Sequence, residues 1–159
     1  MWITVPYLLF LIVWIGGIVF FSFIGAPSIF KSLPSEYAGL AVGAIFSKYY
    51  TMGYVCGGST LVLLIFSGFR MGTWAPLKIF LVLVMLTLTV YAGINLHPRA
   101  RALKEEIHLA TSSESQDPSE LPTLKAEFDR VHHLAVIYNG GVLFLGVLLI
   151  VLTARNLEL

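Results

Sequence analysis

Asn95–Asn139, with the sequence NLHPRARALKEEIHLATSSESQDPSELPTLKAEFDRVHHLAVIYN, holds all four histidines and most of the charged residues of the chain. Its first part is basic and follows directly on an apolar run, which is typical of a helix that leaves a membrane. Pro98 removes a backbone donor and crowds the preceding turn, so we expect a kink at this exit. The basic residues Arg99, Arg101 and Lys104 are expected to contact anionic lipid or a partner protein.

Apolar residues recur at helical spacing on both sides of a polar loop. The loop, residues 110–121, is rich in Ser, Glu and Pro and is expected to lie on the surface. The apolar residues are Ala100, Leu103 and Ile107 before the loop, and Leu124, Phe128, Val131 and Ala135 after it. We therefore predict an antiparallel hairpin that extends the third and fourth spanning helices into the cytosol.

The composition places the chain among membrane proteins. Of its 159 residues, 57% are hydrophobic and only 12% are charged, and the mean hydropathy is +0.85. Four apolar segments each approach the roughly 20 residues that cross a bilayer as a helix. They are about Pro6–Ile24, Tyr50–Phe69, Leu77–Ile94 and Leu134–Thr153. Because lipid cannot pair with backbone groups and these runs do not alternate, we predict an all-α, four-helix transmembrane bundle forming a single domain.

Basic residues are distributed unequally between the two ends of the predicted bundle. Three of them, Arg70, Lys78 and Arg155, lie on the side of the termini, whereas seven lie on the opposite side. This bias predicts a multi-pass protein of the cell (inner) membrane with its termini outside and its two longer connections in the cytoplasm. Met1–Val5 carries no positive charge, so we expect the first helix to be retained. The net charge of +1 favours no nucleic-acid partner.

The connection between the first two apolar segments is expected to follow the membrane surface. Pro27 lies where the first helix should leave the bilayer, and Pro34 provides a second stop. The segment that begins at Ser35 has an apolar side formed by Ala38, Ala41, Val42 and Ile45. We predict a short interfacial helix here. Tyr49 and Tyr50 are expected to mark the membrane interface at its end.

Glycines occur where helices of a membrane bundle can approach closely. Gly16 and Gly17 are adjacent in the first segment, Gly53 and Gly57 form a Gly-x-x-x-Gly pattern in the second, and Gly140 and Gly141 are adjacent in the fourth. We expect these six residues to lie at helix contacts. The pattern leaves open whether the contacts lie within one bundle or between protomers, and the first pair could instead make room for a flat ligand.

Polar residues inside the apolar segments are few. Thr87, Tyr91 and Asn95 recur on one side of the third helix, which we expect to face the bundle interior. His132 and Asn139 are seven residues apart and therefore share a face of the fourth helix.

Short motifs along nearly the whole chain carry a resemblance to a known family. They are Trp14-x-Gly16-Gly17, Ala26-Pro27-x-x-Phe30, Phe46-x-x-Tyr49-Tyr50-x-x-Gly53, and Phe128-x-x-x-His132 with Asn139. With them the chain resembles the small membrane proteins of domain of unknown function 4149, which are similar to transmembrane protein 205. Its four-helix plan is also similar to that of copper-resistance D and HemJ-type proteins. The resemblance implies the four-helix fold and an emphasis on His132, Asn139, Pro27 and the glycines, without an agreed chemistry. The first helix lacks the histidine of the HemJ-type pattern, which weakens the transfer of a haem site.

Three function classes fit the chain. We favour a non-catalytic accessory or scaffold subunit of a membrane complex, whose partners are other membrane-protein subunits or a second copy, because small-residue faces and a basic hairpin suit such contacts. In the second class, His97 and His132 or His133, with Asn139, bind haem or a metal at the cytoplasmic ends of the third and fourth helices. The same histidines could instead be interfacial residues bonded to headgroups. The third class is a small transporter, although no carboxylate or arginine lies at mid-membrane.

Recognised catalytic patterns are absent from the sequence. It contains no Gly-x-Ser-x-Gly, no His-Glu-x-x-His and no phosphate-binding glycine loop with lysine. We therefore name no catalytic residue and lean against an enzyme. Cys56 is the only cysteine, which excludes an internal disulfide and a site with several thiolates.

Overall fold

The computed structural model describes residues 3–112 and 120–155 of the 159-residue chain. Its elements are α1 (Thr4–Phe20), η1 (Phe21–Gly25), α2 (Ala26–Ser32), α3 (Ser35–Met71), α4 (Pro76–Tyr91), η2 (Ala92–Leu96), α5 (His97–Ser112) and α6 (Glu120–Ala154). The segments η1 and η2 are short π-helical stretches. Most of the loop predicted over residues 110–121 lies outside the described residues.

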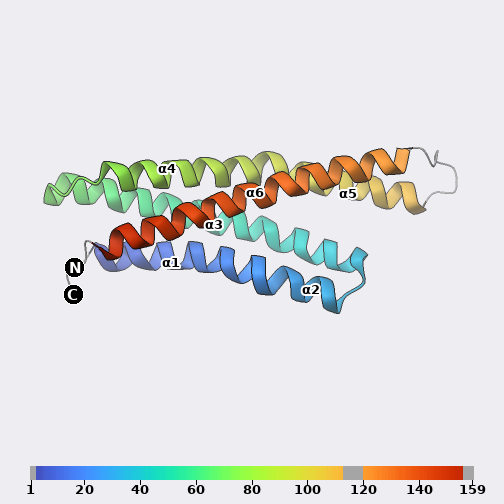
Figure 1. The fold of residues 1–159 in the computed structure, drawn as a ribbon, viewed down its shortest axis with the longest axis horizontal. Helices are drawn as coiled ribbons and strands as arrows, with labels where there is room; N and C mark the ends of the chain where they lie inside the picture. The colour runs from blue at the N-terminus through green and yellow to red at the C-terminus, as the bar shows by residue number, and fades with distance from the viewer. Residues whose placement is uncertain (1–2, 113–119, 156–159) are drawn as a thin grey trace.

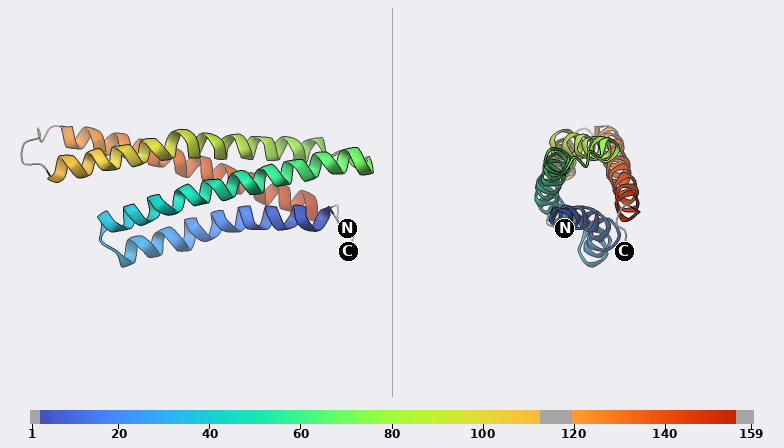
Figure 2. Two further views of the ribbon diagram at one scale, coloured as in Figure 1. Left: turned by 180° about the vertical axis from the view of Figure 1, so that it is seen from behind. Right: turned by 90° about the vertical axis from the view of Figure 1, so that its left-hand side faces the viewer.

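Four long helical runs cross the molecule in alternating directions (Figure 1). Each is long and apolar enough to span a membrane: Thr4–Ser32, Tyr37–Met71, Pro76–Thr111 and Leu121–Ala154. In the described residues α1 packs against α3, α3 against α4, α4 against α6, and α6 against α1, so the runs form a ring in chain order. The predicted all-α, four-helix transmembrane bundle is therefore confirmed. The start of α1 and the end of α6 lie at the same end of the bundle, called here the terminal end (Figure 2).

The core of the bundle is apolar and centres on Trp14. The most completely buried large side chains come from all four runs: Leu11, Trp14, Ile18, Thr60, Val82, Met85, Val142 and Leu149. Trp14 lies against the two glycines of the Gly-x-x-x-Gly pattern on α3. A β-carbon at Gly57 would come 2.7 Å from the Trp14 ring, and one at Gly53 would come 3.3 Å from its nitrogen. These glycines therefore make room for the indole inside the bundle.

The short interfacial helix predicted between the first two spanning helices does not form as a separate element. Instead α3 runs without a break from Ser35 to Met71. No proline lies between Pro34 and Pro76, so nothing in the sequence forces the helix to end before the membrane. The predicted apolar side is used nonetheless, because Ala38 is fully buried and α2 packs back along α3.

Neither Pro27 nor Pro98 ends its helix. Each follows a π-helical turn by two residues, since η1 ends at Gly25 and η2 ends at Leu96. A proline ring crowds the carbonyl group four residues before it, and a wider turn moves that carbonyl away. The π-helical turns therefore let both helices continue past their prolines, α2 as far as Ser32.

The backbone hydrogen bonds show how each π-helical turn closes. The amide of Ala26 donates to the carbonyl of Phe21, and the amide of His97 donates to the carbonyl of Ala92. Both bonds span five residues instead of four, which is the pattern of a π-helix. Each turn adds one residue to the helix and so rotates the residues beyond it relative to those before it.

Beyond η2, α5 packs along the first half of α6 (Figure 1). Leu103 and Val131 are buried between these helices, and Leu124 and Phe128 pack against them. The same cluster includes Tyr50 of α3, so the apolar contact between α5 and α6 is continuous with the interior of the bundle.

Candidate functional site

A hydrogen bond between two side chains crosses the interior of the bundle. The hydroxyl of Tyr49 on α3 donates to Oδ1 of Asn139 on α6, at 3.1 Å. These helices occupy opposite corners of the ring of runs, so the bond joins elements that are not packed neighbours in that ring. The bond is partly buried, and a polar group inside a membrane bundle needs such a partner because lipid supplies none.

An aromatic cluster surrounds Tyr49 and lies next to both π-helical turns. It consists of Phe21, Phe46, Tyr49, Tyr50 and His97. The ring centroids of Phe21 and Phe46 are 4.9 Å apart, and those of Tyr50 and His97 are 5.7 Å apart. Phe21 opens η1 and His97 directly follows η2, so the cluster contains the first residue of one turn and the residue just beyond the other. Such edge-to-face and tilted arrangements are the favoured ones for aromatic pairs.

Tyr49 and Tyr50 do not mark a membrane interface, contrary to our prediction. Tyr50 is only 3% exposed, and Tyr49 is partly buried with its hydroxyl turned inward. Gly93 in η2 makes room for Tyr50 and Tyr54, since a β-carbon there would come 2.9 Å from the Tyr50 ring and would overlap the Tyr54 hydroxyl. Gly93 is not one of the six glycines predicted at helix contacts, because it is a single glycine near the end of an apolar run and no pattern marks it.

His97 is held within the cluster by α3. Its Nε2 lies 3.3 Å from the carbonyl oxygen of Gly43, which can only accept, so Nε2 is the donor. The ring also contacts Phe46 and Tyr50. His97 therefore joins α5 to the part of α3 that extends beyond the predicted membrane span.

His132 lies apart from His97. It is exposed on α6 and stacks on Phe128, with ring centroids 5.9 Å apart and planes inclined by 9°. His133 is exposed as well. Of the three residues predicted to bind a cofactor, His97 and Asn139 meet the aromatic cluster, whereas His132 does not. Within residues 3–112 and 120–155 no group of three or more His, Cys, Asp or Glu side chains is arranged to hold a metal ion.

The three basic residues predicted to contact lipid or a partner have different surroundings. Arg99 is exposed and forms an ion pair with Glu127 of α6. Arg101 is exposed. Lys104 is partly buried, and its ammonium group lies 5.9 Å from the centre of the Phe30 ring and fills the space above Gly39. Lys104 therefore joins α5 to α2 and α3.

The six glycines predicted at helix contacts divide into two groups. Gly17, Gly53, Gly57 and Gly141 face side chains of other helices of this chain, whereas a β-carbon at Gly16 or Gly140 would meet nothing within 4 Å. The last two lie on the outer surface. Gly146 belongs with the first group, because a β-carbon there would meet Ile15 and Met85.

Three polar residues of the third run, Thr87, Tyr91 and Asn95, face outward. This corrects the prediction that they line the interior. Thr87 and Asn95 are exposed, and Tyr91 is 46% exposed. Their place inside is taken by the face that carries Met85 and Thr89. We call Thr87, Tyr91 and Asn95 the outer polar stripe.

The three side chains of the outer polar stripe differ in the interactions that they make. Thr87 donates to the carbonyl of Leu83 in its own helix, at 2.9 Å. Tyr91 stacks on Tyr138 of α6, with ring centroids 5.2 Å apart. Within the part of the chain that the structure describes, the Asn95 amide has no hydrogen-bond partner. An exposed amide of this kind is free to bind a polar group of another molecule.

Comparison with known families identifies one match. The model of a family described as Domain of unknown function (DUF4149) matches residues 9–108, which covers α1 through most of α5. No curated protein and no solved structure matches the chain.

Proposed function

This chain belongs to the family described as Domain of unknown function (DUF4149), and from that premise we propose that it is a non-catalytic accessory or scaffold subunit of a membrane complex. It is an integral membrane protein with four helices that are long and apolar enough to span the bilayer. The observation that carries the proposal is the outer polar stripe, which directs Asn95 away from the bundle.

The interior of the bundle supports a structural role. Several of its polar side chains bond to one another or to their own helix: Tyr49 to Asn139, Tyr7 to Thr153, and Thr89 to the carbonyl of Met85. The buried Thr60 hydroxyl has no partner among the described residues. Groups satisfied in this way stabilise helix packing and leave few donors for a substrate.

The outer polar stripe supports a contact with another protein. Hydrogen bonds between helices are a main source of affinity in a bilayer, where lipid competes poorly for polar groups. An amide such as that of Asn95 can donate two hydrogen bonds and accept at its oxygen. It can therefore bind a polar side chain on a neighbouring helix that lies against α4 and η2.

The partner that we propose is a spanning helix of a different membrane protein. The stripe is flanked by bulky exposed side chains, among them Leu83 (46% exposed) and Ile94 (61% exposed). A second copy using the same face would set bulky residues against bulky residues, whereas close helix approach needs small ones. The partner helix should therefore present small residues and one hydrogen-bonding side chain.

Photocrosslinking in native membranes tests this assignment. We expect benzoylphenylalanine at Ile94 to give one discrete adduct with another protein, and at Phe144, which is exposed on α6, to give none. Asn95→Leu should reduce the adduct and the amount of that protein that copurifies in stoichiometric quantity. Adducts with lipid alone at both positions would overturn the proposal, and an adduct of twice the chain's mass would assign the face to a second copy.

We also propose that the protein lies in the cell (inner) membrane with the α5 and α6 hairpin in the cytoplasm. The support is the excess of basic residues at the hairpin end over the terminal end. In a Cys56→Ala background, a cysteine at Arg101 should resist a membrane-impermeant maleimide in intact cells and react after lysis. Reaction in intact cells would reverse the orientation.

A further inference from the structure

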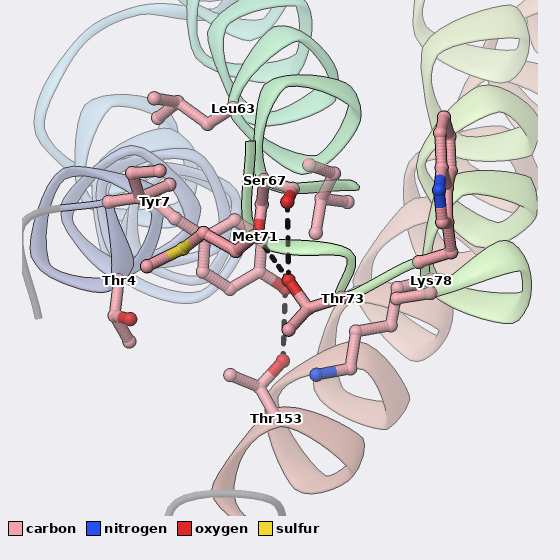
Figure 3. Close-up of a pocket in the computed structure, with 12 residues that line it drawn as sticks. Thr4, Tyr7, Leu63, Ser67, Met71, Thr73, Lys78 and Thr153 are labelled. Atoms are coloured by element: carbon pink, nitrogen blue, oxygen red, sulfur yellow. Dashed lines mark hydrogen bonds between the residues drawn. The ribbon is translucent and has the colours of Figure 1, made fainter. Parts of the chain in front are cut away.

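A pocket of about 380 Å³ opens at the terminal end of the bundle, far from the aromatic cluster (Figure 3). Its wall combines the start of α1, the end of α3, the connection over residues 72–75, the start of α4 and the end of α6. The lining includes the apolar side chains Leu63, Leu64 and Met71 and the indole of Trp74. The pocket thus offers both an apolar wall and a polar rim at the level where the helices begin and end.

Lys78 links this pocket to a second hollow. The second hollow, of about 390 Å³, shares Trp74, Ala75 and Lys78 with the first and adds Leu152 and Arg155. In Figure 3 the Lys78 side chain extends from α4 toward Thr153 of α6. One cation therefore borders both hollows, and a second cation, Arg155, borders one of them.

No described carboxylate neutralises these cations. The acidic side chains that the structure describes are Glu105, Glu106, Glu127 and Asp129, all in α5 or the first third of α6. In the described residues the lining of both hollows contains no Asp or Glu, and neither Lys78 nor Arg155 forms an ion pair. Among the described residues, the lining of the two hollows therefore carries positive charge and no negative charge.

The hydroxyl groups of Tyr7, Ser67, Thr73 and Thr153 in the pocket already donate their protons. Thr153 donates to the carbonyl of Leu149, so Tyr7 is the donor in the 2.9 Å bond between Tyr7 and Thr153. A hydroxyl has one proton to donate, and that of Thr73 goes to the carbonyl of Ser67. The Ser67 hydroxyl is therefore the donor in its bond to the Thr73 hydroxyl. The charged donors available to an anion are the ammonium group of Lys78 and the guanidinium group of Arg155.

We propose that this pair of hollows binds the phosphate headgroup of an anionic phospholipid. Lys78 and Arg155 pair with the phosphate diester, and an acyl chain lies along the apolar wall that includes Leu152. Lys78 is two residues from the start of α4, where the partial positive charge of the helix end adds to the attraction. The apolar wall favours a lipid over a free phosphate ion, because an acyl chain buries apolar surface against the wall and a phosphate ion has no apolar surface to bury.

Native mass spectrometry of the full-length protein in detergent tests the proposal with defined probes. The probes are phosphatidylglycerol, phosphatidylcholine with the same acyl chains, and inorganic phosphate. We expect phosphatidylglycerol to bind about tenfold more tightly than phosphatidylcholine, and the variant Lys78→Gln/Arg155→Gln to lose this preference. The matched control is Arg70→Gln, because Arg70 is a basic residue of the same end that lines neither hollow.

The outcomes separate the alternatives. Loss of the preference in Arg70→Gln as well would mean that only the general charge of the surface matters, and would overturn the site. Displacement of the lipid by inorganic phosphate at similar concentration would replace the lipid with a free anion. Retention of the preference in the double variant would also overturn the proposal. Unchanged circular dichroism and monomer elution of each variant exclude unfolding as the cause. None of these readouts depends on the outer polar stripe.

Discussion

Tyr49 of α3 and Asn139 of α6 are joined by a 3.1 Å hydrogen bond across the interior of a bundle in which their helices lie at opposite corners. They are separated by 90 residues in the sequence. Phe46 and Tyr50 pack around Tyr49, so aromatic rings surround the donor of this partly buried bond. It fixes the distance between two helices that the other contacts in the ring connect only indirectly.

Removing either partner should leave the other without this hydrogen bond. We expect Tyr49→Phe and Asn139→Leu each to lower the free energy of unfolding by about 1 kcal/mol, with a coupling of about 0.6 kcal/mol in the double variant. Denaturant titration in detergent measures both quantities. Tyr138→Phe is the control, because its partly exposed ring stacks on Tyr91. Strictly additive effects of the two substitutions would contradict a direct bond.

A β-carbon at Gly57 has no room beside Trp14. Gly57→Ala should lower the free energy of unfolding by about 1–3 kcal/mol, because the indole or α3 must shift. Gly58→Ala is a matched control on the next position of the same helix, where a β-carbon meets nothing within 4 Å. The control should be neutral or slightly stabilising, since alanine favours the helix. Thermal unfolding measures both effects. Equal effects of the two substitutions would contradict the close contact between Gly57 and Trp14.

The two histidines named for cofactor binding should differ in their contribution to stability. His97→Ala removes two ring contacts and a hydrogen bond to Gly43, so we expect a loss of about 1–3 kcal/mol. His132→Ala, at an exposed position, should change the free energy of unfolding by less than about 0.5 kcal/mol. An absorption spectrum of the native protein completes the experiment. A Soret band that both substitutions abolish would show that both histidines serve one haem.

Thr60 is fully buried, and its hydroxyl oxygen has no hydrogen-bond partner among the described residues. Thr60→Val replaces that hydroxyl with a methyl group of similar size, which removes a desolvated polar group. We expect the free energy of unfolding to rise by about 1 kcal/mol. Thr89→Val is the comparison, because the Thr89 hydroxyl donates to the carbonyl of Met85, so the same change should give no gain. A loss of stability in Thr60→Val would indicate that the Thr60 hydroxyl has a hydrogen-bond partner, which would contradict the structure.

The ion pair between Arg99 and Glu127 should contribute little to stability. Both side chains are substantially exposed, at 63% and 39%. We expect Arg99→Ala to cost less than about 1 kcal/mol and the cost to shrink as salt is added. Thermal unfolding at low and high salt measures this. A larger cost that salt does not change would mean that the pair is shielded from water.

The four spans and their order could be predicted from the sequence because lipid restricts the backbone. Runs such as those around Leu11 and Leu149 are too long and too apolar for water, and in a bilayer such a run must be a helix. The apolar spacing of Leu103 and Val131 likewise predicted the faces that are buried where α5 packs on α6. These residues recur at helical spacing among charged residues, so the periodicity of the sequence carries information about which face is buried.

The inward face of each spanning helix could not be predicted in the same way. The side chains of Thr87, Tyr91 and Asn95 point outward, whereas Tyr49 and Tyr50 point inward. The continuous α3 and the π-helical turns before Pro27 and Pro98 were not predicted either. The local sequence permits several helix endings, and packing selects one of them.

The sequence alone determined that the chain is a four-helix membrane protein, because only helices satisfy the backbone of such apolar runs in lipid. The tertiary structure decided which polar residues meet inside, as Tyr49 and Asn139 do, and which face outward, as Asn95 does. The physical reason is that lipid is as apolar as the core. The hydrophobic effect therefore does not distinguish the two sides of a spanning helix, and the fit of Trp14 against Gly53 and Gly57 does.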